Sequence, residues 1–404
     1  MRGTGAWGTG RCGLVRGVAP KVGRGPMTAK RDGCLAEARP LASPCAVRSR
    51  PSGPEPSAPG PVQLLHRRGP HVESVQRVHV AVVDAGGRLL AAAGEPDFRT
   101  FWRSAAKPLQ ALPVVHGGAA DRFGFGAEAL ALACASHSSE PRHVAVARRM
   151  LAAVGAEEAA LACGPHVPLS PRIAAEVARE GTTLTPSWSN CSGKHAAMLA
   201  ACAHHGWAPA GYERSGHPLQ ARIRDAVRRW TDVPDDTLGE GVDGCTTVSF
   251  HLPLTGMALA YARLTAPADA LPAACRDEAA PAARLVQAMM ADPFLVAGTG
   301  RACTDLMAAF GGALVAKVGA AGVYSAGLVG HGIGIALKIE DGGDLAETAV
   351  ALVAVLDAVV PRLAPSLAEP LAAPAVRAHA RLPVRSTRGA DVGSVDAAGA
   401  LAWS

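Results

Sequence analysis

Strand-like segments stand on both sides of a long helical block, and this order restricts the folds open to the chain. The segment 78–94, "VHVAVVDAGGRLLAAAG", alternates apolar and polar residues and breaks at a Gly-Gly pair, as a β-hairpin does. Helical patterns dominate 127–206, and a further helix fits 217–232. A second alternating group, 313–341, precedes a helical pattern at 345–364. This order predicts an α+β fold, in which helices flank an antiparallel sheet.

The first 60 residues differ in composition from the rest of the chain. They are rich in Gly, Pro, Ser and Arg without apolar periodicity, so we expect a disordered extension at 1–60 and a folded domain at 61–404. Ten basic residues against three acidic ones give this extension a charge of +7, so 61–404 carries −1 of the net charge of +6. The nearly neutral folded domain therefore lacks the electrostatic signature of a nucleic-acid-binding protein.

The longest uncharged run of the folded domain, 318–337, has the length of a membrane span. Its glycines and His331 instead favour short strands joined by turns. No apolar core of a secretory signal occurs in 1–60, and the ten cysteines lack the regular spacing of a disulfide framework. We therefore expect a soluble cytoplasmic protein with free thiols.

Lysine is scarce, with six lysines among the 40 basic residues, and four of the six lie in the folded domain at Lys107, Lys194, Lys317 and Lys338. Arginine stays protonated in proteins, whereas a desolvated lysine can lose its proton and act as a base or a ligand. The retained lysines are therefore candidates for chemistry. Lys338 is the exception, because it has no motif around it and is interpreted as a solvated residue at the end of a strand.

The tetrapeptide Ser104-Ala-Ala-Lys107 begins an expected helix. Residues three apart share a helix face, so a neutral Lys107 amine can take the proton of the Ser104 hydroxyl and make it a nucleophile. The alternative is a capping serine followed by a solvated lysine.

Ser136, in "LACASHSSEP", and Lys317, in "AKVG", follow later in the chain. The order of the three elements is similar to that of penicillin-recognising acyl hydrolases, which carry Ser-x-x-Lys, a serine-centred loop and Lys-Thr-Gly on a strand. The second and third elements depart from those spellings in this chain.

The segments "NCSGKHAAM" and "VDGCTT" contain a candidate metal site. Cys191 and Lys194 lie one turn apart at the start of a helix, where the dipole favours a thiolate. With Cys245 they would give zinc two thiolates and one amine, leaving the fourth tetrahedral position open. The alternative is that the cysteines are inert packing.

Six ordered motifs together resemble the asparaginase II family of rhizobial-type L-asparaginases, from about Val72 to at least Asp341. The motifs are RSAAKPLQALP, CASHSSEP, NCSGKHAAML, VDGC, GTGR with TDLM, and AKVGAAGVYSAGL. The resemblance implies a fold related to serine β-lactamases and glutaminases, hydrolysis of L-asparagine to L-aspartate and ammonia, and a homodimer. It also implies two Ser-Lys pairs and a zinc site, made respectively by Ser104 with Lys107, Ser136 with Lys317, and Cys191, Lys194 and Cys245.

On this interpretation Ser104 attacks the side-chain amide with Lys107 as base, while Ser136 and Lys317 relay a proton to the leaving ammonia. Zinc would orient the substrate. Arg103, His195 and Asp243 lie beside the motifs and are expected to hold the α-amino and α-carboxylate groups of the substrate. Two alternatives remain on the same fold, namely a penicillin-recognising acyl hydrolase and a non-catalytic sensor that keeps its acyl adduct.

The chain departs from the family pattern in several places near these motifs, one of which is the spelling GRACTDLM. Thr246 and Ser139 stand where glycine is usual, and Ser189 replaces an asparagine. No proposed catalytic atom is lost, but Thr246 adjoins Cys245, so we expect it to affect the turn that aims this proposed zinc ligand.

Overall fold

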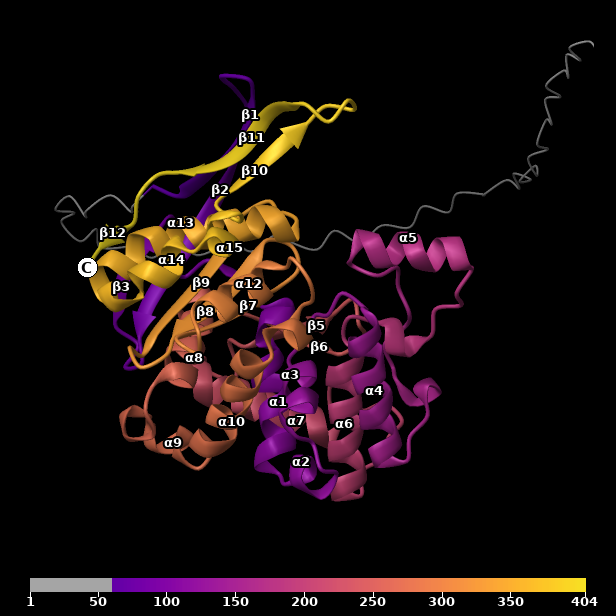
Figure 1. The fold of residues 1–404 in the computed structure, drawn as a ribbon. Helices are drawn as coiled ribbons and strands as arrows, with labels where there is room; N and C mark the ends of the chain where they lie inside the picture. Colours follow the sequence, from indigo (N-terminus) through magenta and orange to yellow (C-terminus); the bar gives the residue numbers. More distant parts are fainter. Residues whose placement is uncertain (1–59) are drawn as a thin grey trace, which may run out of the picture. The chain divides into compact units, whose positions relative to one another are not determined.

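The computed structural model describes residues 60–404, so the extension expected at 1–60 lies outside the described residues except for Gly60. The described residues form blocks of strands and blocks of helices that follow one another along the chain (Figure 1). The longer helices are α1 (Lys107–His116), α3 (Ala127–Ala133), α4 (Pro141–Val154), α5 (Pro171–Glu180), α6 (Ser192–His205), α7 (Pro218–Thr231), α8 (Leu254–Thr265), α10 (Ala279–Ala291), α12 (Ala302–Ala309) and α13 (Leu345–Leu363). Among the described residues, no helix is both long and apolar enough to cross a membrane.

An antiparallel sheet of nine strands forms the main scaffold, in the order β10-β11-β1-β2-β9-β8-β7, with β3 on β2 and β12 on β3. The strand β2 pairs directly with β9, so the N-terminal hairpin and the C-terminal strands share one sheet. The predicted α+β fold is thus confirmed. The strands are β1 (Val62–Arg68), β2 (His71–Asp84), β3 (Leu89–Ala93), β7 (Leu314–Val318), β8 (Val323–Leu328), β9 (Ile333–Ile339), β10 (Arg381–Arg385), β11 (Asp391–Ala398) and β12 (Ala402–Trp403).

Helices cover both faces of this sheet. The helix α13 packs on one face, against strands that include β1, β9 and β11, and α8 packs on the other, against β2, β8 and β9. A capping box starts α13, because the Asp344 carboxylate accepts from the backbone N–H of Glu347 at 2.8 Å while the Glu347 side chain accepts from that of Asp344 at 3.0 Å. On the other face, a Cβ at Gly334 would lie 1.8 Å from the carbonyl oxygen of Ala258. Only glycine allows α8 to approach β9 this closely.

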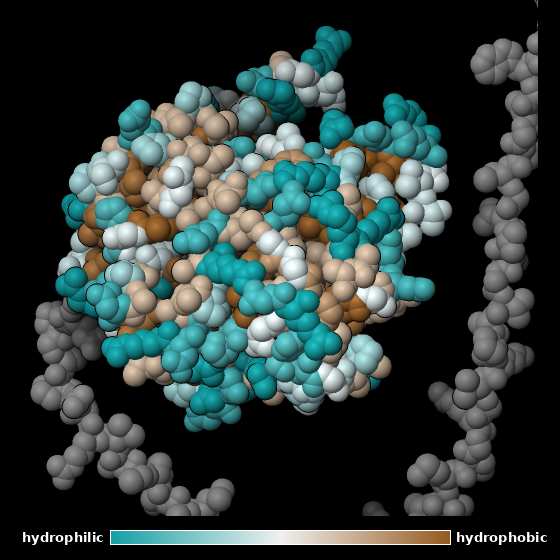
Figure 2. All heavy atoms as spheres, turned by 60° about the horizontal axis from the view of Figure 1, so that its bottom comes forward, coloured by the Kyte–Doolittle hydropathy of each residue, from teal (hydrophilic) through white to brown (hydrophobic). Residues whose placement is uncertain are grey.

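A group of helices that includes α1, α6 and α7, which pack against one another, lies at the bottom of Figure 1. This side of the molecule, turned forward in Figure 2, carries hydrophilic and hydrophobic residues interspersed.

A second sheet of three short strands positions the candidate site. It has the order β4-β6-β5, formed by β4 (Arg99–Phe101), β6 (Val248–Pro253) and β5 (Gly239–Val242). The chain leaves β4 directly into Trp102–Ser104 and leaves β5 directly into Asp243–Cys245. Two motifs that lie far apart in the sequence therefore follow strands that both pair with β6.

Candidate active site

Ser104 lies on a short 3₁₀ helix, η1 (Arg103–Ala106), which follows β4. The fully buried Trp102 anchors this helix, because its backbone N–H donates to the Phe250 carbonyl at 2.9 Å and its indole donates to Ser325 Oγ at 3.1 Å. The Tyr261 hydroxyl donates to the Ala105 carbonyl at 2.8 Å. Ser104 is itself half-buried, so a rigid support presents its hydroxyl at a partly open position.

Ser104 faces a cavity of about 370 Å³ that brings together motifs from distant parts of the chain. The volume is at the lower end of the range for small-molecule sites. The cavity is lined by Arg103, Ser104, Gly164, Pro165, His166, Leu169, Ser189, Asn190, Cys191, Asp243, Gly244, Cys245 and Ala320.

A buried group, here called the Ser-Lys cluster, consists of Lys107, Ser136 and Lys317. Ser136 Oγ accepts from Lys107 Nζ at 3.0 Å and from Lys317 Nζ at 2.8 Å. Lys107 also donates to the Ala135 carbonyl, and Lys317 donates to the Val318 carbonyl at 2.8 Å. Burial, aided by the nearby Lys107, lowers the pKa of Lys317 to about 7. An amine of this kind can exchange protons near neutral pH.

The Lys107 amine makes no hydrogen bond with Ser104 among the described residues, although the tetrapeptide spacing predicted that contact. Ser104 belongs to the 3₁₀ helix while Lys107 is the first residue of α1, and the backbone N–H of Lys107 donates to the Ser104 carbonyl. The side chain of Lys107 instead turns toward Ser136. A buried amine takes the acceptors that surround it, and these come from the segment before α4. Lys107 of the first predicted pair therefore contacts the serine of the second pair, Ser136, which also accepts from Lys317.

The three candidate zinc ligands, here called the Cys-Lys cluster, are Cys191, Lys194 and Cys245. All three are buried, and Lys194 Nζ lies 3.0 Å from Cys245 Sγ and 2.7 Å from Thr247 Oγ1. A hydrogen bond from the Cys191 thiol lowers the pKa of Cys245, and the charge of Lys194 lowers it further. The pKa of Cys191 is raised correspondingly by Cys245 and by burial.

The chemistry of these donors fits zinc, with a condition. Among residues 60–404, no group of three His, Cys, Asp or Glu side chains is placed to hold a metal ion. Two sulfurs are present beside the cavity, and the third donor would have to be the Lys194 amine. Burial lowers the pKa of Lys194, but Cys245 and Cys191 outweigh burial and raise it overall, so metal binding would displace a proton from this amine.

Arg103 and Asp243, which were predicted to bind substrate, lie together on the cavity wall. Arg103 Nε donates to Asp243 Oδ1 at 2.9 Å, and the same oxygen accepts from the Gly244 backbone N–H at 2.7 Å. The ion pair ties the segment of Ser104 to the turn of Cys245. The third residue of this prediction, His195, is completely buried and does not line the cavity.

The turn that carries Cys245 contains a strained residue. The backbone N–H of Thr246 donates to the Asp243 carbonyl at 2.8 Å, and Thr246 adopts φ +76°. Ser139 has φ +59°. Both positions, where the family pattern has glycine, therefore require a left-handed backbone that is unfavourable for a β-branched residue in particular. Thr246 keeps the geometry of the turn, with its hydroxyl donating to the Ala162 carbonyl at 3.1 Å.

We expect Thr246→Gly to raise the free energy of unfolding by up to about 1 kcal/mol, because relief of strain exceeds the loss of the hydroxyl hydrogen bond. Thr246→Val keeps the strain and loses the hydrogen bond, so it should be less stable than the wild type by about 1 kcal/mol. Urea unfolding of the three proteins checks this order, and a glycine variant less stable than the valine variant would contradict it.

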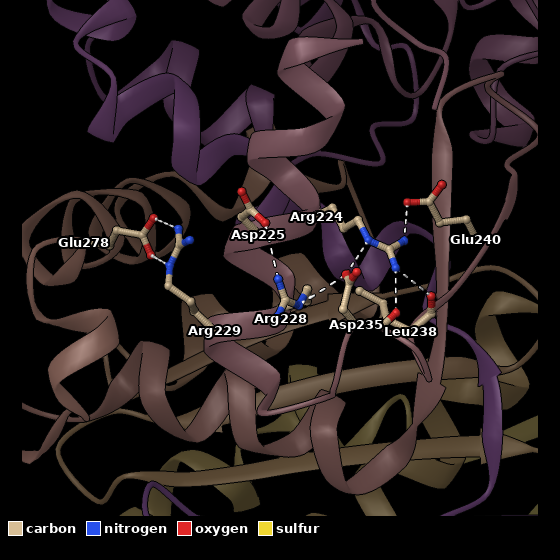
Figure 3. A network of polar contacts seen from close by, with 8 residues as sticks. All are labelled: Arg224, Asp225, Arg228, Arg229, Asp235, Leu238, Glu240 and Glu278. Carbon is tan, nitrogen blue, oxygen red and sulfur yellow. Dashed lines mark hydrogen bonds and ion pairs between the residues drawn. The ribbon is translucent and has the colours of Figure 1, made fainter. Parts of the chain in front are cut away.

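An ion-pair network on α7 fixes the loop that leads to β5 (Figure 3). Arg224 donates to Asp235 Oδ1 at 2.8 Å, to Glu240 Oε1 at 2.6 Å and to the Leu238 carbonyl at 3.3 Å. Glu240 belongs to β5, whose next residues form the Asp243 turn. The network therefore supports the Cys-Lys cluster from outside the cavity.

Several residues of the cavity were not predicted from the sequence. His166 precedes α5 and accepts from the Asn190 backbone N–H at 2.8 Å, although no motif marks it. Asn190 begins a motif that was noted for Cys191 and Lys194. Ala320 follows β7, where Gly319 is so close to η1 that a Cβ would lie 3.0 Å from the Trp102 carbonyl. Ala320 lies inside the motif AKVGAAGVYSAGL, but only this contact between distant segments shows that it lines the cavity.

Lys338, which the sequence analysis placed in solvent, is buried. Its amine donates to the carbonyls of Ile339 and Glu340, and burial lowers its pKa. The prediction was wrong because β9 runs through the sheet centre between β2 and β8, which the local sequence does not reveal.

Comparison of the sequence with models of protein families matched residues 65–397 to the family described as L-asparaginase II. No match was found among curated proteins.

Proposed function

The chain belongs to the L-asparaginase II family, and from this premise we propose that it hydrolyses the side-chain amide of L-asparagine with Ser104 as the nucleophile. The observation that carries this proposal is the position of Ser104, which lines the cavity, whereas the members of the Ser-Lys cluster are buried and are not among the lining residues. A nucleophile must reach the substrate, whereas the groups that exchange its proton need only reach the nucleophile.

The proton of Ser104 would go to Lys107, three residues along the chain. Ser136 Oγ contacts both amines of the cluster, so a proton moved from Lys107 through Ser136 to Lys317 would leave Lys107 neutral. The neutral amine would then have to turn from Ser136 toward Ser104 to accept its proton. The pKa of Lys317, lowered to about 7 mainly by burial, makes it a suitable acceptor. The reverse movement would return a proton to the leaving ammonia, and the same groups would then serve the water that releases aspartate.

The oxyanion of the tetrahedral intermediate needs hydrogen-bond donors. Two backbone N–H groups on the cavity wall, those of Ser104 and Ala320, donate to no acceptor within residues 60–404. We assign them this role. The zwitterionic part of asparagine would bind Asp243 through its ammonium group and Arg103 through its carboxylate.

Zinc, if bound by the Cys-Lys cluster, would supply a fixed positive charge at the cavity that orients the substrate. We expect the purified protein to contain about one zinc per chain, because the three donors together form one binding site. Cys245→Ser should lose most of this zinc. Cys202 is also buried but lies on α6 and is not a proposed ligand, so Cys202→Ser should retain the zinc. Metal analysis by mass spectrometry checks both variants, and equal zinc in the two would contradict the assigned ligands.

The activity is tested by ammonia release from L-asparagine and L-glutamine, with residues 60–404 and with the whole chain. We expect release from asparagine. A folded, zinc-replete protein that releases ammonia from neither amide would exclude the proposal, and a stable acyl adduct with a β-lactam would then identify the penicillin-recognising alternative. Family membership also leads us to propose a cytoplasmic homodimer. Light scattering coupled to size-exclusion chromatography measures the molar mass in solution, which should be twice that of one chain.

A further inference from the structure

His195 lies in the first turns of α6, next to Lys194, but its ring belongs to a separate hydrogen-bond chain. His195 Nδ1 is 2.6 Å from the hydroxyl oxygen of Tyr212. The same hydroxyl oxygen accepts from the Ala162 backbone N–H at 2.9 Å. Gln220 fixes the Tyr212 backbone by donating to its carbonyl at 2.8 Å. Both rings are buried, with His195 fully inaccessible.

A count of protons selects one tautomer for this chain. Tyr212 Oη has one hydrogen, and Ala162 occupies one of its lone pairs. If His195 donated from Nδ1, the Tyr212 hydrogen would be left without an acceptor in residues 60–404, because these two are the contacts of Oη there. An unpaired buried hydroxyl hydrogen is unfavourable. The favoured arrangement is therefore donation from Tyr212 to Nδ1, which places the proton of the neutral ring on Nε2.

The second nitrogen points to the Cys-Lys cluster. His195 Nε2 is buried and has no hydrogen-bond partner at normal distance within the described residues. Its nearest ionic neighbours include Cys245 and Lys194, which affect the pKa of His195 in opposite directions.

We propose that Tyr212 holds His195 as the Nε2-protonated tautomer, so that His195 is a hydrogen-bond donor toward the Cys245 sulfur and not a fourth metal ligand. His195 is then a positioning residue that acts through Cys245, in place of the direct contact with substrate expected from the sequence. A protonated nitrogen has no lone pair for a metal, and a donor beside a ligand sulfur reduces the negative charge on it. The inference rests on the geometry of the cluster and holds whether or not asparagine is the substrate.

The test is the nitrogen spectrum of His195 in the whole chain labelled with ¹⁵N-histidine at pH 7. His195→Gln identifies the signals by their loss. We expect Nδ1 to have the shift of an unprotonated nitrogen and Nε2 that of a protonated one, both without metal and with zinc. A protonated Nδ1 would overturn the proposal, as would a coupling between Nε2 and bound ¹¹³Cd.

Tyr212→Phe separates the tyrosine from other influences on the ring. This change removes the donor to Nδ1, so the Nδ1 resonance should move toward the position of a nitrogen without a hydrogen bond. Tyr324→Phe is the matched control, since Tyr324 is equally buried but contacts Cys303. It should leave the His195 signals unchanged. An Nδ1 resonance that is unaffected by Tyr212→Phe would refute the role of Tyr212, and the wild-type spectrum still decides the tautomer if that variant fails to fold.

Discussion

Replacing Ser104 with alanine is expected to lower kcat for asparagine hydrolysis by roughly 10⁴- to 10⁶-fold, the usual cost of removing a nucleophile. Ser104 lines the cavity on a helix held by Trp102 and Tyr261, and these supports do not depend on its hydroxyl. The free energy of unfolding should therefore change by less than about 1 kcal/mol. Ammonia release and urea unfolding of the same preparation measure the two effects.

Ser189 offers a matched control for this experiment, because it lines the same cavity and contacts no lysine of the described structure. Ser189→Ala should retain activity within about tenfold, as a change to a cavity wall that makes no transition-state contact. Ser136→Ala should also be strongly impaired, since it removes the acceptor shared by Lys107 and Lys317. If Ser136→Ala is inactive while Ser104→Ala retains substantial activity, the nucleophile is Ser136 and the assignment fails.

Elements with strong local signals were predictable from the sequence. The β2–β3 hairpin turns at its Gly-Gly pair, with Gly87 at φ +90°. The helix α7 runs between its caps His217 and Asp232, as expected from the periodic pattern. Both follow from residues close together in the chain, whose turn and capping preferences need no tertiary context.

The small sheet and the C-terminal strands were not predicted. Strand β5 has two glycines and an exposed Val242, and β4 has only three residues, so neither shows the alternation of a half-buried strand. Strand β10 contains Pro383 and is mostly exposed at the sheet edge. Such strands are stabilised by pairing with distant segments, and the residues of the strand itself do not reveal which segment that is.

The site followed the same division between local and distant information. The motifs identified Ser104, Lys107, Ser136 and Lys317, but spacing alone does not state which acceptor a buried amine will choose. The direction of Lys107 toward Ser136 depends on the placement of α1 against the segment before α4. The burial of His195 depends in the same way on Tyr212, a residue of the loop between α6 and α7 that no motif marks.

Replacing Lys317 with methionine should abolish activity and at the same time stabilise the protein. Removal of the amine leaves Ser136 without its second lysine, so kcat should fall by roughly 10³-fold or more, as for loss of a general acid–base group. The lowered pKa of Lys317, caused first by burial and then by Lys107, means that folding opposes protonation of this amine. An apolar side chain of similar length avoids that cost, and we expect a gain on the order of 1–3 kcal/mol at pH 7 after the lost hydrogen bonds are subtracted.

The dependence on pH has a definite sign. The pKa is about 7 in the folded protein and 10.5 as the ordinary value, so between these values the unfolded chain binds one more proton. Wild-type stability attributable to Lys317 therefore rises from pH 7 to pH 10.5, and the advantage of the methionine variant should be full below pH 7 and shrink above it. Wild-type activity should rise as pH passes through about 7, where the Lys317 amine becomes neutral.

Lys338 provides the control that separates stability from catalysis. It too is buried, and burial lowers its pKa. Its amine donates to the carbonyls of Ile339 and Glu340 and makes no hydrogen bond with Ser136 among the described residues. Lys338→Met should change stability with pH in the same sense while retaining activity. If both variants remain active, the acid–base role of Lys317 is refuted, and if Lys317→Met shows no dependence of its stability gain on pH, the amine is not held near neutrality. A stabilised but inactive Lys317→Met beside an active Lys338→Met would show that the chain accepts a cost in stability at this one lysine for the sake of proton transfer.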